Sequence, residues 1–146
     1  MKISINTDPS VTETEITINC SALTPEINDL IAALRMMDNR LTVTKGEESI
    51  ILDISSIAYI ESVDRRTFVY TADECYETKM KLYEMEERLC GIGFMRISRS
   101  CLVRLRFIRS IKAEFDRKLR LTLENGEQMI VSRQYADELK QRLGVR

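Results

Sequence analysis

The spacing of the apolar residues changes near Leu41, and this change limits the folds that the chain can adopt. Between residues 24 and 37 the apolar side chains recur as on one face of an α-helix, and Thr24–Pro25 supplies a helix start. From Leu41 onward they mostly alternate with polar side chains, in short runs separated by turn-forming residues. Such alternation is typical of strands with one buried face. The sequence therefore predicts a mostly β protein of the α+β class with short helices.

The runs on either side of this change predict the individual elements. Residues 2–6 and 15–20 alternate and predict a strand pair, so that the chain opens with a short ββα segment. Further strands are expected at 41–43, 50–52, 57–61, 67–71, 102–103 and 108–111. The last elements expected are a helix at 81–90 ended by Gly91, a hairpin with arms at 119–123 and 129–131, and a helix at 133–143 between Ser132 and Gly144. The hairpin turns at Asn125–Gly126, a pair that accepts the positive φ values of a type I′ turn.

The chain is long enough for one ordinary domain with a short extension. Its 146 residues fit a single core, and 44% of them are hydrophobic. A boundary is expected near residues 38–40, where the acidic opening gives way to the strand-rich remainder. The sequence thus predicts an N-terminal extension at 1–40 and a larger domain at 41–146.

The residue types that are absent exclude most enzyme classes. The chain has no histidine, which excludes Ser-His-Asp and Cys-His catalysis and zinc sites built on histidine. It also lacks a glycine-rich phosphate loop. We therefore expect a non-enzymatic protein with no catalytic residues, no metal site, no cofactor and no small-molecule substrate.

The cysteine pattern indicates a reducing compartment, and the lack of long apolar runs indicates that the chain does not cross a membrane. Cys20, Cys75, Cys90 and Cys101 are widely spaced and form no C-x-x-C pair, so we expect reduced thiols in the core. No run approaches the roughly 20 apolar residues that cross a bilayer, and the first residues lack the apolar region of a signal peptide. A cytoplasmic location is expected.

The formal net charge of −1 conceals a strong asymmetry along the chain. Residues 1–62 carry four basic and ten acidic side chains, whereas residues 63–146 carry eighteen basic and thirteen acidic ones. The densest basic stretch contains no acidic residue and includes Arg96, Arg99, Arg104, Arg106, Arg109 and Lys112. A stretch of this kind can bind a polyanion.

One segment within this stretch combines cations with small hydroxyl donors. Alternation over residues 94–104 sends Ile97 inward and leaves a solvent-facing set of Arg96, Ser98, Arg99 and Ser100. A guanidinium group can bond phosphates and guanine edges, and a serine hydroxyl can hold a phosphate. A solvated basic loop is the alternative interpretation.

Two further candidate segments lie at turns. Residues 64–67 form a polar turn between two strands, which is either an ordinary hydrophilic hairpin tip or a contact surface. Residues 131–133 open the last helix, where unsatisfied backbone N–H groups and the helix dipole favour an anion beside Arg133. The alternative is that Ser132 only caps the helix while Arg133 is a surface residue.

Taken in order, these segments resemble the LytTR family of bacterial DNA-binding domains. The resemblance covers residues 41–143, and its most specific pieces are the sequences IAYIES, FMRISRSCLV, LENGE and VSRQYADELKQRLG. It implies an elongated assembly of small antiparallel β-sheets that inserts loops into successive grooves at paired DNA repeats.

The resemblance also implies which residues face DNA. They are Arg65, Arg66 and Thr67 on a first loop, Arg96, Ser98, Arg99 and Ser100 on a second, and Arg133 on a third. Arg104 is expected to contribute as well, at a position where many relatives carry Asn. The absence of histidine from these loops also departs from many relatives, so base preference is expected to differ.

The function implied is that of a sequence-specific transcription regulator. Its expected partners are double-stranded DNA, a second copy of the chain on that DNA, and a membrane-bound regulatory protein. The stretch before the domain is too short for a phosphoacceptor receiver domain, so receiver phosphorylation is not the expected switch. The alternative is a protein-interaction or anti-regulator module that keeps the fold without binding specific DNA.

Overall fold

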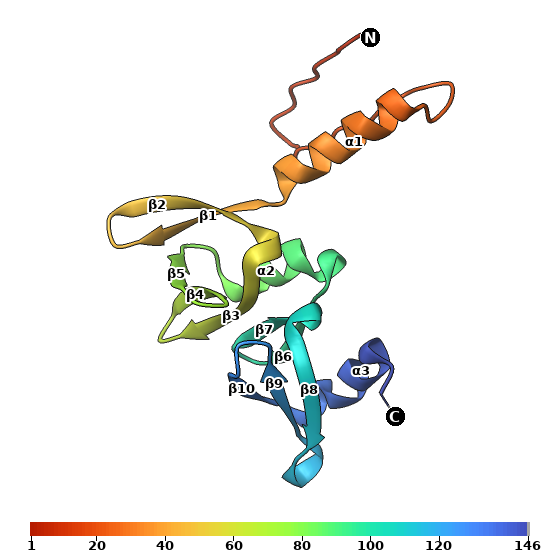
Figure 1. Cartoon of the computed structure of the whole chain (residues 1–146). Coiled ribbons are helices and arrows are strands. Elements are labelled where there is room, and N and C mark those ends of the chain that lie inside the picture. The colour runs from red at the N-terminus through yellow and green to blue at the C-terminus, as the bar shows by residue number, and fades with distance from the viewer. Residues whose placement is uncertain (146) are drawn as a thin grey trace. The chain divides into compact units, whose positions relative to one another are not determined.

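A computed structural model describes residues 1–145, and residues 35–38 by their backbone alone. It divides into two compact units, residues 1–35 and the chain from residue 36 onward (Figure 1). In the described part of the chain, no helix is both long and apolar enough to cross a membrane.

The first unit contains most of helix α1 (Pro25–Asp38). The Thr24 hydroxyl accepts a hydrogen bond from the Ile27 amide at 3.3 Å, so the predicted helix start is confirmed. The strands predicted at 2–6 and 15–20 are wrong, because neither segment forms a strand in the structure. A two-stranded ribbon is marginal without a third element to cover its apolar face, and Ile3 and Ile5 are 77% and 85% exposed.

The second unit is built on two antiparallel sheets. The larger sheet has the strand order β2-β1-β5-β4-β3-β7-β6 and the smaller one the order β10-β9-β8. The strands of the larger sheet are β1 (Arg40–Lys45), β2 (Glu48–Asp53), β3 (Ile57–Val63), β4 (Arg66–Thr71), β5 (Cys75–Thr78), β6 (Phe94–Ser98) and β7 (Cys101–Arg104). The smaller sheet contains β8 (Ile108–Ala113), β9 (Leu119–Leu123) and β10 (Gln128–Val131), and the helices of this unit are α2 (Leu82–Leu89) and α3 (Arg133–Leu143). The predicted α+β class with antiparallel sheets is confirmed.

Alternating side chains give the larger sheet an apolar cluster on each face. On one face Ile60 and Leu102 belong to the cluster that contains Met85 of α2. On the other face Ile97 and Val103 belong to a cluster formed with the smaller sheet and α3, whose buried members are Leu119, Leu121, Leu123, Val131, Ala136 and Leu139. Burial on both faces keeps the register of the central strands fixed, because a one-residue slip would exchange the two faces.

The structure revises two predicted turns. At Asn125–Gly126 only the glycine has a positive φ (88°), so this hairpin does not have the predicted type I′ turn. Positive φ values at two successive residues occur instead at Asp64 (50°) and Arg65 (66°), between β3 and β4. After α2 the chain continues as a 3₁₀ turn, and the left-handed residue is Gly93 rather than the predicted Gly91.

The prediction that all four cysteines lie in the core is also wrong. Cys101 is buried, but Cys20, Cys75 and Cys90 are exposed free thiols. Cys101 begins β7, whose first three residues are all buried, whereas Cys75 occupies the exposed first position of β5 and Cys90 follows the last residue of α2. An apolar neighbourhood in sequence did not distinguish these settings.

Candidate nucleic-acid interface

Two of the candidate segments meet at one edge of the larger sheet. Strands β3 and β7 are antiparallel with Glu61 opposite Cys101, so the end of β3 lies beside the start of β7. The amide of Ser62 donates to the carbonyl of Ser100 at 2.8 Å. The turn between β3 and β4 is therefore adjacent to the turn between β6 and β7.

The third candidate segment is attached to the same edge. The amide of Ser132 donates to the carbonyl of Ile97 at 2.9 Å, which places the start of α3 beside the end of β6. Arg133 is the first residue of that helix. The structure thus brings together the turn at residues 64–65, the turn at residues 99–100 and the N-terminus of α3, which we call the three-turn edge.

At the first turn, one arginine is exposed and free to contact a ligand, whereas the next two residues interact with the protein itself. Arg65 is exposed, and within the part of the chain that the structure describes its side chain makes no hydrogen bond or ion pair. Arg66 pairs with Glu77 through two bonds of 2.8 Å and lies over the Phe68 ring at 5.3 Å. The hydrogen bond from Arg66 lowers the pKa of the Glu77 carboxyl. Thr67 is only 4% exposed, so its side chain belongs to the protein interior.

The side chain of Arg96 stabilises the second turn through hydrogen bonds. Its guanidinium donates to the carbonyl of Arg99 at 2.7 Å and to the carboxylate of Glu86 at 3.2 Å, and its side chain is 15% exposed. The Ser98 hydroxyl accepts from the amide of Ser100 at 3.3 Å and closes the turn. The Arg99 side chain is exposed, without a recorded partner among the described residues. Arg96 and Ser98 therefore shape the turn that presents Arg99.

The third segment combines a helix start with an exposed cation. Ser132 occupies the N-cap position of α3, but its side chain makes no capping hydrogen bond. The first-turn amides of the helix therefore remain suited to an external acceptor. The side chain of Arg133 is 65% exposed and makes an ion pair with Asp116 at 3.4 Å, which solvent screens.

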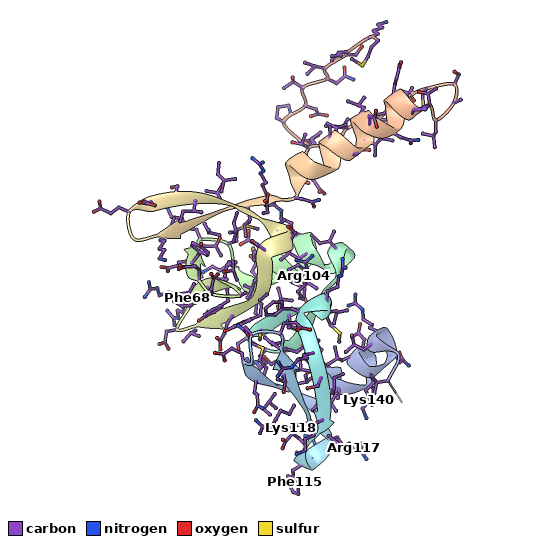
Figure 2. The ribbon with its side chains drawn as sticks, in the orientation of Figure 1. Phe68, Arg104, Phe115, Arg117, Lys118 and Lys140 are labelled. Atoms are coloured by element: carbon purple, nitrogen blue, oxygen red, sulfur yellow. The ribbon has the colours of Figure 1, made fainter. Side chains whose placement is uncertain are left out.

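Several cations next to this edge were not assigned from the sequence. Lys79 and Lys81 line a hollow of about 320 Å³ together with Arg65. Arg117 and Lys118 are exposed at the turn between β8 and β9, which the Arg133–Asp116 pair joins to the start of α3 (Figure 2). The signal that could have found them is their position next to an element boundary, since Lys79 and Lys81 immediately precede α2.

Arg104 lies away from the three-turn edge. Arg104 is the last residue of β7, whereas the turn at 99–100 comes before the first residue of that strand. The guanidinium of Arg104 donates to the carbonyl of Ser55, which precedes β3. Burial, followed by the charge of Arg106, lowers the pKa of Arg104. The arginines of the basic stretch are thus divided between opposite ends of the sheet.

A family model and a solved structure match this chain. The model is described as the LytTr DNA-binding domain and matches residues 47–144. The structure is a LytTr DNA-binding domain of a putative methyl-accepting/DNA response regulator from Bacillus cereus. It superimposes with a TM-score of 0.68 at 28% identity and covers 73% of this chain and 97% of that one.

Curated relatives match as well. The sensory transduction protein LytT of Bacillus cereus is 37% identical over 100 residues, which are 68% of this chain and 41% of LytT. LytT of Bacillus subtilis is 32% identical over 107 residues, 73% of this chain and 44% of that protein. The chain thus spans less than half the length of these two relatives. An uncharacterised HTH-type transcriptional regulator of Staphylococcus aureus is 24% identical, and the match covers 99% of both chains.

Proposed function

This chain belongs to the LytTR family of DNA-binding domains, and on that premise we propose that it regulates transcription by docking the three-turn edge on repeated sites in promoter DNA. The observation that carries the proposal is the pair of backbone hydrogen bonds, Ser62 to Ser100 and Ser132 to Ile97, that gathers three cationic segments. The proposed activity is binding rather than catalysis.

We assign base recognition to Arg65, Arg99 and Arg133. Each is exposed at a different segment of the edge, and an arginine bonds the O6 and N7 atoms of guanine in a bidentate manner. Phosphate contacts are assigned to the flanking lysines Lys79 and Lys81 and to the first-turn amides of α3. The two groups differ in effect, since base contacts discriminate sequences and phosphate contacts set affinity and register.

The remaining residues of the expected contact set receive other roles. Arg96, Ser98 and Ser100 shape the second turn, and Arg66 is held by Glu77 beside the first. Thr67 is buried and Arg104 lies at the other end of β7, so neither is included among the proposed contacts.

The contact assignment is tested by anisotropy with the DNA upstream of the chain's own gene. Arg99→Ala and Arg133→Ala should each weaken specific binding by about 1–3 kcal/mol. Arg109→Ala is the matched control, because Arg109 is exposed near the opposite end of β8 from the turn at Asp116. Equal effects of all three substitutions would refute the assignment.

We further propose that two copies bind adjacent repeats. Copies spaced by one helical turn, about 34–36 Å, would meet the same face of the duplex. Footprinting should then reveal two protected segments with that spacing. A single protected segment that saturates at one protein per duplex would contradict binding as a pair.

Residues 1–35 support a second candidate function, the binding of a membrane-bound regulatory protein. This unit exposes the apolar side chains of Ile3, Ile5 and Ile16, and it carries more acidic than basic residues. Membrane vesicles from the source cells should retain the full chain but not residues 36–146. Equal retention, or none, would refute this candidate.

A further inference from the structure

A hollow of about 660 Å³ lies at the end of the larger sheet away from the three-turn edge. It is formed where β7 ends and where the chain enters β3, and its lining includes Arg40, Asp53, Ile54, Ser55, Ile92 and Arg104. Figure 2 shows Arg104 well apart from Phe115, Arg117 and Lys118. The volume falls within the range of about 300–1,000 Å³ that is usual for small-molecule sites.

The charge of this hollow is positive and incompletely balanced. Arg104 is half-buried and bonds only a neutral acceptor, the carbonyl of Ser55, with no ion pair recorded to any described carboxylate. Arg106 is close enough for its charge to lower the pKa of Arg104. The one carboxylate in the described lining, that of Asp53, lies 3.6 Å from the Nε atom of Arg40. A guanidinium held partly out of water without a counter-charge favours an anion.

The same hollow presents apolar surface next to these cations. The exposed part of it is Ile92, which follows α2 and is 43% exposed. A hydrated inorganic ion would leave this surface in water. A molecule with an apolar body would cover it.

We propose that the hollow around Arg104 binds a small organic anion, a molecule in which a carboxylate or phosphate group is attached to an apolar body. The acidic group bonds the guanidinium of Arg104, and the body covers the exposed side chain of Ile92. This site is separate from the three-turn edge and does not depend on the DNA-binding proposal.

The experiment is a titration of the full, ¹⁵N-labelled chain with phenyl phosphate, followed by NMR. Phenol supplies the apolar body without the charge, and inorganic phosphate supplies the charge without the body. Phenyl phosphate should cause saturable shifts at the amides of Ser55, Ile92 and Arg104, with a Kd on the order of 1 mM or lower. Phenol and inorganic phosphate should each bind about tenfold more weakly.

Two variants and one control locate the site. Arg104→Gln should weaken binding about tenfold or more while keeping a donor for Ser55. Ile92→Glu should weaken binding as strongly, because it adds a carboxylate to the hollow that competes with the ligand for Arg104. Ile92 is 43% exposed, so the substitution does not disturb the core. Arg117→Gln, at the turn between β8 and β9, should leave the Kd unchanged.

Three results would overturn the proposal. The first is the absence of saturable shifts in the hollow. The second is a set of shifts at the three-turn edge that Arg104→Gln and Ile92→Glu leave intact. The third is that promoter DNA alone shifts the amides of the hollow, since its occupant would then be the nucleic-acid backbone.

Discussion

The guanidinium of Arg96 donates to the main-chain carbonyl of Arg99 at 2.7 Å, so a half-buried arginine supports the turn that presents an exposed one. Both residues come from the same acid-free stretch of sequence, and both were expected to face the same ligand. The structure separates their roles, because Arg96 also pairs with Glu86 of α2. Through this ion pair, the second turn is connected to α2, which packs against the face of the larger sheet that carries Ile60 and Leu102.

The support given by Arg96 can be measured by removing it. Arg96→Ala should lower the free energy of unfolding by about 1–3 kcal/mol, because the carbonyl of Arg99 and the carboxylate of Glu86 lose a charged donor. Urea denaturation measures that loss. DNA affinity should fall in parallel, although Arg96 itself is not among the proposed DNA contacts.

Glu86→Gln provides the matched comparison for Arg96. It keeps an acceptor for the guanidinium and leaves the bond to Arg99 in place, so the loss of stability and of DNA affinity should be smaller. Amide hydrogen exchange at Arg99 and Ser100 should accelerate in Arg96→Ala only. Unchanged exchange in that variant would mean that the turn does not depend on Arg96.

The first turn presents the exposed cation of Arg65 on a strained backbone. Asp64 and Arg65 both have positive φ, which glycine, asparagine and aspartate tolerate but arginine does not, so the strain lies mainly at Arg65. The double change Asp64→Asn and Arg65→Gly should raise the free energy of unfolding by about 1 kcal/mol and weaken DNA binding. Thermal unfolding and anisotropy measure the two effects.

Arg65→Ala separates the two effects, since it removes the charge and keeps the strained backbone. It should weaken DNA binding as much as the double change without stabilising the fold. Full DNA affinity in both variants would exclude Arg65 from the contact surface.

The cysteines provide a test of burial. Burial, together with the charge of Glu61, raises the pKa of the Cys101 thiol to about 12. Iodoacetamide at pH 8 should therefore modify Cys20, Cys75 and Cys90 in the native protein and Cys101 only after unfolding. Mass spectrometry of the alkylated peptides distinguishes the four sites, and rapid native labelling of Cys101 would contradict the packing of β7.

The same shift makes stability depend on alkaline pH. The folded-state pKa of Cys101 lies above its ordinary value of 9.0. The stabilisation that the protonated thiol gives the folded state is therefore fully present below pH 9. It is lost as the pH rises toward 12, since the unfolded chain releases the proton first. Tyr70, whose pKa burial raises to about 12, acts in the same direction. Cys101→Ala should flatten the decline in urea midpoint above pH 9, and an unchanged slope would exclude this thiol as a cause.

Much of the fold could be predicted from the sequence where periodicity and burial agree. The alternation around Ile97 predicted an inward side chain that the structure buries, and Thr24–Pro25 predicted the start of α1. The strand β5 escaped prediction because its four residues are mostly half-buried or exposed and form no clear alternation. The strands predicted at 2–6 and 15–20 failed for the opposite reason, since alternation alone does not supply a partner.

The candidate site was predictable in composition but not in geometry. The sequence identified Arg65, Arg99 and Arg133 as cations at turns, and the resemblance grouped them. It could not reveal that Arg66 pairs with Glu77 and Arg96 with Glu86, because these pairs join residues 11 and 10 positions apart that only the folded chain brings together. Nor could it place Arg104 at the opposite end of β7 from the turn at 99–100.

Fluorescence anisotropy across a salt series measures whether this chain recognises a specific DNA sequence. The duplex from the promoter region of the chain's own gene is compared with a scrambled duplex of equal length and composition. Specific binding should exceed nonspecific binding by a ratio of order 10³ or more. The logarithm of the binding constant should fall with log salt by about 0.9 per phosphate neutralised. Equal affinity for both duplexes at every salt concentration would contradict the claim and leave only a nonspecific cationic surface.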